Sequence, residues 1–228
     1  MNHQLASLIA ANIAFVGGHF VLSHPLRAFL VGLLGERLFL ALYSLVQIAA
    51  FGWIIVTFRA VGPGGQTLWN GQTTTTWAIA SVLTLLSLVL FVGSLKGNPA
   101  LPATNPGAIA IAKPYGVFAV TRHPMMWGIA IWALAHVLVV PNARTAITAT
   151  SMAILALLGS YLQDRKKEDL LGQDWNGWES RTNFAPRLRR IGQAGLGTWT
   201  VAMVAWLLLT WAHIPLAAIP AGIWLWIG

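Results

Sequence analysis

Histidines at apolar stretches are the residues of this chain best suited to chemistry. His123 stands in a Thr-Arg-His-Pro tetrad at the mouth of a hydrophobic stretch, while His19, His24 and His136 lie at the ends of, or inside, other apolar stretches. An imidazole ring in hydrocarbon costs free energy unless it is hydrogen-bonded or bound to a metal. We therefore interpret these histidines as a functional set rather than as packing residues.

The composition is that of an integral membrane protein. Hydrophobic residues make up 57% and charged residues 9% of the 228 residues, far from the balance of a soluble domain. The net charge of +8 falls in short loops between apolar segments, so it indicates orientation in a bilayer, and we exclude nucleic acid as a partner. The chain has no cysteine, which leaves histidine as its only strong side-chain ligand for a soft or borderline metal.

Six apolar stretches are predicted to cross the bilayer, at about 20 residues per crossing. They cover residues 5–22, 38–58, 76–95, 125–140, 146–162 and 198–213. The end of the chain, from Thr198 to Gly228, is long enough to turn at Pro215 and Pro220 and return as a partial seventh segment. The first stretch is expected to be a retained helix, because no Lys or Arg precedes it. The predicted fold is all-α, a polytopic transmembrane helical bundle that forms one domain over residues 1–228.

Basic residues are distributed unequally between alternate loops. Twelve of the fourteen lie in the first, third and fifth loops, at positions 27, 37, 96, 113, 122, 165–167, 181, 187, 189 and 190. Only Arg59 and Arg144 lie in the opposite loops. Because cytoplasmic loops are enriched in Lys and Arg, this asymmetry predicts a multi-pass protein of a bacterial inner membrane with loops one, three and five in the cytoplasm.

Two of the basic loops are long enough to have a role of their own. Residues 96–121 contain four prolines and three glycines, so this loop cannot be helical throughout and is expected to lie across the cytoplasmic face. Residues 164–171 predict an amphipathic continuation of the fifth stretch. Gly172 and Gly177 are then expected to break the regular structure.

Each histidine also has a structural interpretation. His19 follows two glycines, which allow a second helix or a flat ligand to come close, and its ring could simply bond a neighbouring helix. His24 precedes a proline and is expected at a helix exit, as an interfacial cap or as a functional group. His136 is flanked by apolar residues on both sides, and no charged residue in its stretch could pair with it. His3 is expected to be exposed, and His213 to lie at the outer interface.

Helix geometry limits how the histidines could share a metal. His123 and His136 would lie about 19.5 Å apart along a helix, too far for one iron. A six-coordinate haem iron would therefore draw one ligand from the first stretch and one from the fourth. Depth in the bilayer favours His19 with His123, whereas burial favours His19 with His136.

Three segments of the chain resemble the NnrU family, and the likeness extends over most of the sequence. They are residues 15–25, 37–44 and 115–128. That family is linked to denitrification and nitric-oxide metabolism, and it is similar to the 15-cis-zeta-carotene isomerases, membrane enzymes that use haem b. The resemblance implies haem b binding with His19 and His136 as the iron ligands, and His24, His123 and Arg122 are further cofactor-binding candidates.

The resemblance implies more than one use for such an iron. It could serve the isomerisation of a lipid-soluble polyene, with the protein supplying shape and excluding water. It could also sense or handle nitric oxide, or pass electrons to a membrane redox partner. A non-catalytic role in assembling a neighbouring reductase is the haem-free alternative.

A second resemblance points to another class of enzyme. Arg122-His123-Pro124 and a later acidic element are similar to motifs of the isoprenylcysteine and phospholipid methyltransferases, where they help to bind S-adenosylmethionine. The later element consists of Glu168, Asp169, Gly172, Trp175, Trp178, Arg181 and Pro186. The second acidic residue is Asp rather than Glu, and tryptophans replace the usual tyrosines, so we favour a shared scaffold over retained methyl transfer.

The same residues have a structural interpretation at the membrane surface. Glu168 or Asp169 could pair with Arg122 or Arg181 and so orient the two long loops without catalysis. A carboxylate could likewise hold His123.

Overall fold

The computed structural model describes residues 3–99 and 111–227, and within these ranges the regular structure is helical, with no strand. Five of the described helices are long and apolar enough to cross a membrane. They are α1 (His3–Ser23), α3 (Glu36–Val61), α4 (Thr74–Gly93), α7 (Ala143–Leu171) and α9 (Leu196–Ala217). A sixth apolar helix, α6 (Pro124–Val139), is shorter. The protein is therefore an all-α, multi-pass membrane protein, and the predicted fold class is confirmed.

Shorter elements connect these helices or follow the last of them. They are α2 (Arg27–Leu34), α8 (Gln173–Arg181), α10 (Trp224–Ile227) and the 3-10 helices η1 (Gly116–Ala119) and η2 (Leu188–Ala194). Helix α7 continues to Leu171, as predicted, and Gly172 ends it with a φ of 50°. The expectation for Gly177 was wrong, because this residue lies inside α8. The buried Trp175 and Trp178, three residues apart on one face, hold that short helix in place. Part of the loop over residues 96–121 lies outside the described residues.

The end of the chain turns back as expected, with Pro220 in the turn, although Pro215 does not end the helix. Helix α9 continues through Pro215 and ends at Ala217, where Ala218 adopts a left-handed conformation with a φ of 55°. Proline lacks a backbone N–H donor, but the loss of one hydrogen bond near the end of a helix does not prevent the last turn from forming. The indole of Trp224 in α10 donates to the carbonyl of Leu207 at 3.1 Å, and this bond holds the C-terminal segment against α9.

The helices fall into two compact units. Unit 1 comprises residues 1–70 and 140–155, and unit 2 comprises residues 71–139 and 156–228. Helix α7 contributes its first part to unit 1 and its second part to unit 2. The single domain expected from the sequence stays a prediction.

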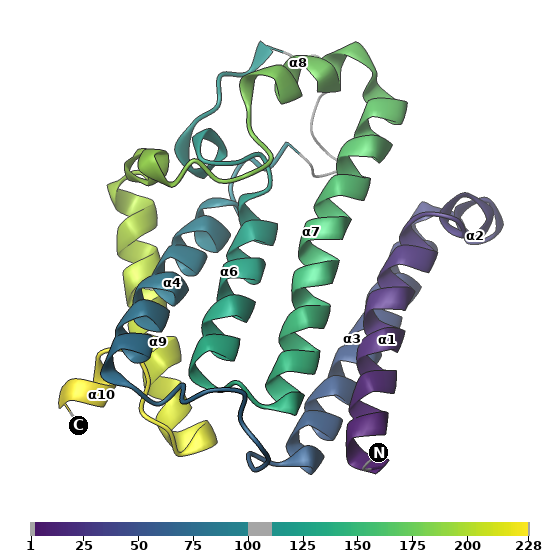
Figure 1. Ribbon diagram of the computed structural model, residues 1–228. Coiled ribbons are helices and arrows are strands. Elements are labelled where there is room, and N and C mark those ends of the chain that lie inside the picture. The colour runs from purple at the N-terminus through teal and green to yellow at the C-terminus, as the bar shows by residue number, and fades with distance from the viewer. Residues whose placement is uncertain (1–2, 100–110, 228) are drawn as a thin grey trace. The chain divides into compact units, whose positions relative to one another are not determined.

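In unit 1, α1 and α3 run side by side (Figure 1). Their close approach depends on Gly18, where an added Cβ would lie 3.0 Å from the side-chain amide group of Gln47. Gln47 is 6% exposed, a polar side chain enclosed between two apolar helices. This packing brings Gln47 next to His19.

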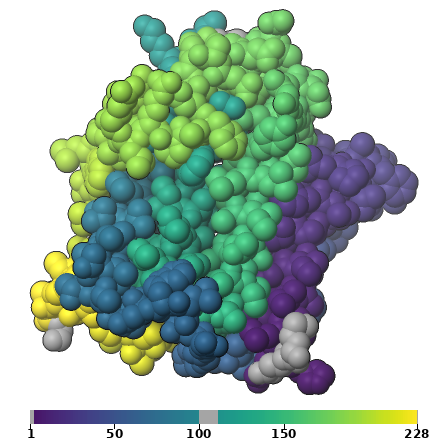
Figure 2. Space-filling view, viewed as in Figure 1, coloured from purple at the N-terminus to yellow at the C-terminus, as the bar shows by residue number. Residues whose placement is uncertain are grey.

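In unit 2, both α6 and α9 pack on α4, and Figure 2 shows α4 and α6 side by side on one face. A Cβ at Gly128 would lie 2.8 Å from the backbone oxygen of Ser87, so α6 can approach α4 only with glycine at this position. The Ser87 hydroxyl donates to the Gly128 carbonyl at 2.7 Å. On the other side, the Trp206 indole of α9 donates to the Thr84 hydroxyl at 2.9 Å.

One end of unit 2 is closed by non-membrane segments that position the Arg-His-Pro element. Trp175 and Trp178 are each 1% exposed and pack in a core with Phe118 of η1. Backbone hydrogen bonds join the segment before η2 to the segment before α6, from Arg187 to Val120 and from Arg122 to Asn183. The strip around η2, yellow-green in Figure 2, lies over this end of the unit. These contacts fix where the side chains of Arg122 and its neighbour point.

The Gly128 contact yields a stability prediction. Gly128→Ala should lower the free energy of unfolding by about 1–3 kcal/mol, the usual range for overpacking, because the Ser87 backbone cannot withdraw easily. Gly52→Ala is the matched control, since a Cβ there meets no atom within 4 Å. Thermal unfolding of the purified variants in detergent measures both. Equal stability of the two variants would contradict the proposed role of Gly128.

Candidate functional site

Arg122 is the centre of a partly buried charge cluster in unit 2. Its Nε donates to Asp164 Oδ2 at 2.8 Å, and its Nη2 lies 2.7 Å from the same oxygen. Nη2 also lies 2.8 Å from Glu179 Oε1, so one guanidinium joins carboxylates of α7 and α8. The side chains of Arg122 and Asp164 are only 13% and 7% exposed, so solvent screens their attraction weakly.

His123 belongs to the same cluster. Its Nε2 lies 2.8 Å from Asp164 Oδ1, and its side chain is 2% exposed. Asp164 thus uses one oxygen for the guanidinium and the other for the imidazole. The prediction that a carboxylate holds His123 is confirmed, and the bond occupies the ring nitrogen that would most readily bind a metal.

The predicted partners of Arg122 were wrong. Glu168 pairs with Arg165 at 3.0 Å instead, and Arg122 is held by Asp164 and Glu179. The continuous α7 helix explains the difference, because Asp164 comes one turn before Glu168 on the same face and meets Arg122 first. The position of Glu179 could have been predicted in part, because it lies four residues after the buried Trp175 and therefore shares that face of α8.

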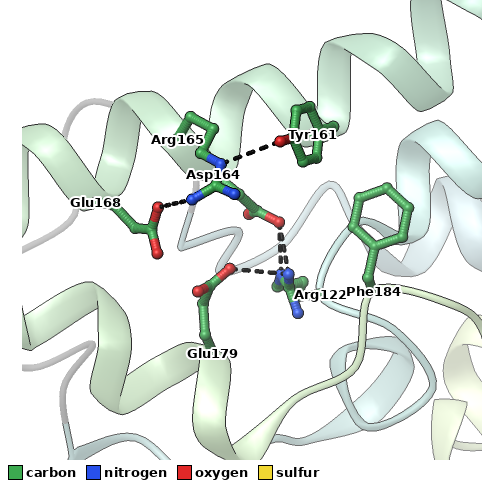
Figure 3. A pocket seen from close by; sticks show the side chains of 7 residues that line it. All are labelled: Arg122, Tyr161, Asp164, Arg165, Glu168, Glu179 and Phe184. Carbon is green, nitrogen blue, oxygen red and sulfur yellow. Dashed lines mark hydrogen bonds and ion pairs between the residues drawn. The ribbon is translucent and has the colours of Figure 1, made fainter.

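A cavity of about 350 Å³ opens beside this cluster (Figure 3). It is lined by Arg122, Tyr161, Asp164, Arg165, Glu168, Glu179 and Phe184. Glu168 and Glu179 approach it from two different helices, as Figure 3 shows. Burial raises the pKa of Glu179, against the opposing effect of Arg122, and the charges of Asp164 and Glu168 raise it further. The cavity offers two guanidinium groups and three carboxylates, a lining suited to a polar ligand of mixed charge.

In unit 1, His19 lies on α1 with its Nδ1 2.9 Å from the Phe15 carbonyl, one turn earlier. With its amide nitrogen toward α1, the Gln47 side chain lies 2.7 Å from that Nδ1 and 3.2 Å from the Phe15 carbonyl. A neutral imidazole has one N–H, so Nδ1 either donates to Phe15 or accepts from Gln47. The orientation of the Gln47 amide therefore determines which ring nitrogen of His19 carries the proton.

His24 follows the last residue of α1, as expected for a helix exit. Its Nδ1 lies 2.8 Å from the Ser23 hydroxyl, and its Nε2 is buried without a hydrogen-bond partner. His3 is exposed, also as expected.

His136 in unit 2 stands next to another histidine. Its ring centroid lies 6.4 Å from that of His213 on α9, with 33° between the ring planes. Nδ1 of His136 lies 2.8 Å from the Trp132 carbonyl, and Nδ1 of His213 lies 2.7 Å from the Leu209 carbonyl. The sequence placed His213 at an interface and did not associate it with His136.

The described residues contain no group of three or more His, Asp or Glu arranged to hold a metal ion. Of the predicted site residues, Arg122 and His123 come together, whereas His19 and His24 belong to unit 1 and His136 to unit 2. The ligand pair His19 and His136 stays a prediction.

The charge cluster yields a second prediction. Asp164→Asn should lower the free energy of unfolding by about 3–5 kcal/mol, because it leaves a nearly buried guanidinium and imidazole without their shared anion. Glu168→Gln is the control, since its pair with the 60% exposed Arg165 should contribute less than about 1 kcal/mol. Denaturant unfolding in detergent compares them. A loss for Asp164→Asn no larger than that of the control would show that the cluster is not structural.

Comparisons with known proteins identify the family of this chain. The profile of the family described as NnrU protein matches residues 7–221. The chain is 28% identical over 160 residues to the chloroplastic 15-cis-zeta-carotene isomerase of Arabidopsis thaliana and 26% identical over 160 residues to that of Zea mays. Each alignment covers 68% of this chain and 42% of the relative, so the chain matches less than half the length of these isomerases. No solved structure matches. Since the family profile spans nearly the whole sequence, the chain belongs to the NnrU family.

Proposed function

We propose that this protein is a haem-binding membrane isomerase that converts a lipid-soluble polyene between cis and trans forms. The observation that carries the proposal is the likeness to two 15-cis-zeta-carotene isomerases over 68% of the chain. A carotenoid is a long conjugated hydrocarbon, so it dissolves in the bilayer in which the helices of this protein lie. Large exposed side chains such as Ile13, Ile48 and Val56 give α1 and α3 apolar outer faces suited to that solvent.

Haem b is the cofactor that we propose, with His19 and His136 as its ligands. A neutral imidazole binds iron through the nitrogen that carries no proton, and a hydrogen bond from the other nitrogen fixes that state. His136 has Nδ1 2.8 Å from the Trp132 carbonyl, which leaves Nε2 for the metal. His19 has Nδ1 2.9 Å from the Phe15 carbonyl, and it likewise offers Nε2 when Nδ1 donates to that carbonyl rather than accepting from Gln47. The donor set therefore fits haem iron. His123 fits less well because Asp164 holds its Nε2.

The bound haem would supply a Lewis-acid or one-electron site for the conjugated chain. The residues of the protein would hold and orient that site. Gln47, whose amide nitrogen lies 2.7 Å from Nδ1 of His19, would orient that imidazole on α1. Trp132, whose ring centroid lies 4.2 Å from that of His136, would fix the second imidazole and exclude water from it.

The family likeness supports a second use of the same iron. In a denitrifying bacterium, the protein could handle or sense nitric oxide in the inner membrane, with electrons from a membrane redox partner. The basic segment that carries Arg122 would then face the cytoplasm.

Haem binding is tested by absorption spectroscopy of the purified protein. We expect a Soret band that shifts on reduction with dithionite, and a loss or shift of that band in His19→Ala and in His136→Ala. His3→Ala, at an exposed position, should keep the full band. An unchanged band in both ligand variants would refute the ligand pair, and a folded, colourless protein would favour an assembly role.

The cavity at Arg122 supports methyl transfer as a second candidate function. S-adenosylmethionine carries an ammonium, a carboxylate and a sulfonium, and the lining offers carboxylates and guanidinium groups on facing elements. In this function, Glu168 would bind a cationic group of the ligand.

Calorimetry with S-adenosylmethionine tests this second function. Glu168→Ala should weaken binding about tenfold, as expected for loss of one charged hydrogen bond. Gly52→Ala is the control, because Gly52 does not line the cavity and a Cβ there meets no atom within 4 Å. Absence of binding to the unaltered protein would exclude methyl transfer.

A further inference from the structure

We propose that His136 and His213 form a two-imidazole site for a divalent transition-metal ion such as Cu²⁺. The described residues bring no other two histidine rings together. The inference shares His136 with the proposed function, so the ion and haem iron would compete for this ring, but it requires neither His19 nor isomerase activity.

Both rings present the same nitrogen for binding. The carbonyls of Trp132 and Leu209 lie within 2.8 Å of Nδ1 in His136 and His213, respectively. Each carbonyl can only accept, so each Nδ1 carries the proton and each Nε2 has a free lone pair. Two neutral imidazoles with fixed tautomers are a donor pair typical of copper, zinc, nickel and iron sites.

The separation of the rings suits one metal between them. With metal–nitrogen bonds of about 2.0–2.1 Å, two imidazoles on opposite sides of one ion place their ring centroids roughly 6 Å apart. The observed centroid separation is 6.4 Å, with 33° between the planes. This spacing favours an ion that takes nitrogen ligands opposite each other, as tetragonal Cu²⁺ does.

The two histidines are carried on helices that are fixed to a common neighbour. His136 is three residues from the end of α6, and His213 is four residues from the end of α9. The bond from Ser87 to Gly128 holds α6 on α4, and the bond from Trp206 to Thr84 holds α9 on α4. A site built on packed helices keeps its geometry before the metal binds.

Other ligands must come from outside the pair. No third His, Asp or Glu joins it among the residues that the structure describes. Water would complete the coordination shell of the ion. Both histidines are partly exposed, which leaves room for such ligands.

The experiment measures Cu²⁺ binding by calorimetry and hemin binding by absorption on the full chain in detergent. Every protein carries His3→Ala, because this exposed histidine near the N-terminus would itself bind copper. We compare that background with added His213→Ala, His213→Gln or His19→Ala. Thermal unfolding of each confirms that it is folded, and His213→Gln retains size and polarity if the alanine variant is unstable.

We expect both His213 variants to weaken Cu²⁺ binding at least tenfold, and to remove one nitrogen from its electron paramagnetic resonance signal, while His19→Ala has no effect. Bound hemin should keep its spectrum in the His213 variants, because the proposed haem ligands are other histidines. Unchanged Cu²⁺ binding in the His213 variants, or conversion of their bound hemin from a six-coordinate to a five-coordinate spectrum, would overturn the inference. Failure of the proposed function is distinct, since it appears as a missing Soret band whatever the copper result.

Discussion

The position of one guanidinium determines the arrangement of a whole end of unit 2. Arg122 precedes α6 and binds carboxylates from α7 and α8, so three elements depend on one side chain. A guanidinium can do this because its donors form a planar fork that serves more than one oxygen. Lysine, with a single compact ammonium, would not hold both carboxylates in this geometry. The cavity opens beside this centre, and the core of the buried tryptophans fixes the segment that carries it.

In the membrane helices, by contrast, polar side chains bond mostly within their own helix. Hydroxyls of Thr57, Ser81 and Ser160 donate to carbonyls four residues earlier, and three histidine rings face carbonyls at the same spacing. Hydrocarbon offers no other partner, so the helix backbone supplies it. For His136 and His213 this pattern has a chemical result, because it fixes the proton on Nδ1 and leaves Nε2 as the available ligand. Gln47, Ser87 and Trp206 differ, since each bonds a neighbouring helix.

Much of the fold could be predicted from the sequence, because hydrophobic length alone identifies a helix that crosses a bilayer. All six predicted stretches correspond to apolar helices, although α3, α7 and α9 extend further than the apolar pattern indicated. The importance of Arg122 and His123 was visible in their tetrad. Their partners were not, because Asp164 and Glu179 lie 42 and 57 residues away from Arg122 in the chain, and one sequence cannot show which carboxylate reaches an arginine. The approach of His213 to His136 depends on how α6 and α9 pack on α4, which no local pattern encodes.

The length of α7 has a consequence for how molecules reach this protein. Its 29 residues extend about 43 Å at 1.5 Å per residue, whereas the hydrocarbon core of a bilayer is about 30 Å thick. The helix is therefore about 13 Å longer than one crossing needs, and its charged last turns, which carry Asp164 and Glu168, are the part least suited to hydrocarbon. The cavity beside these turns is lined by charged side chains, so it is accessible to a polar ligand that stays outside the hydrocarbon core.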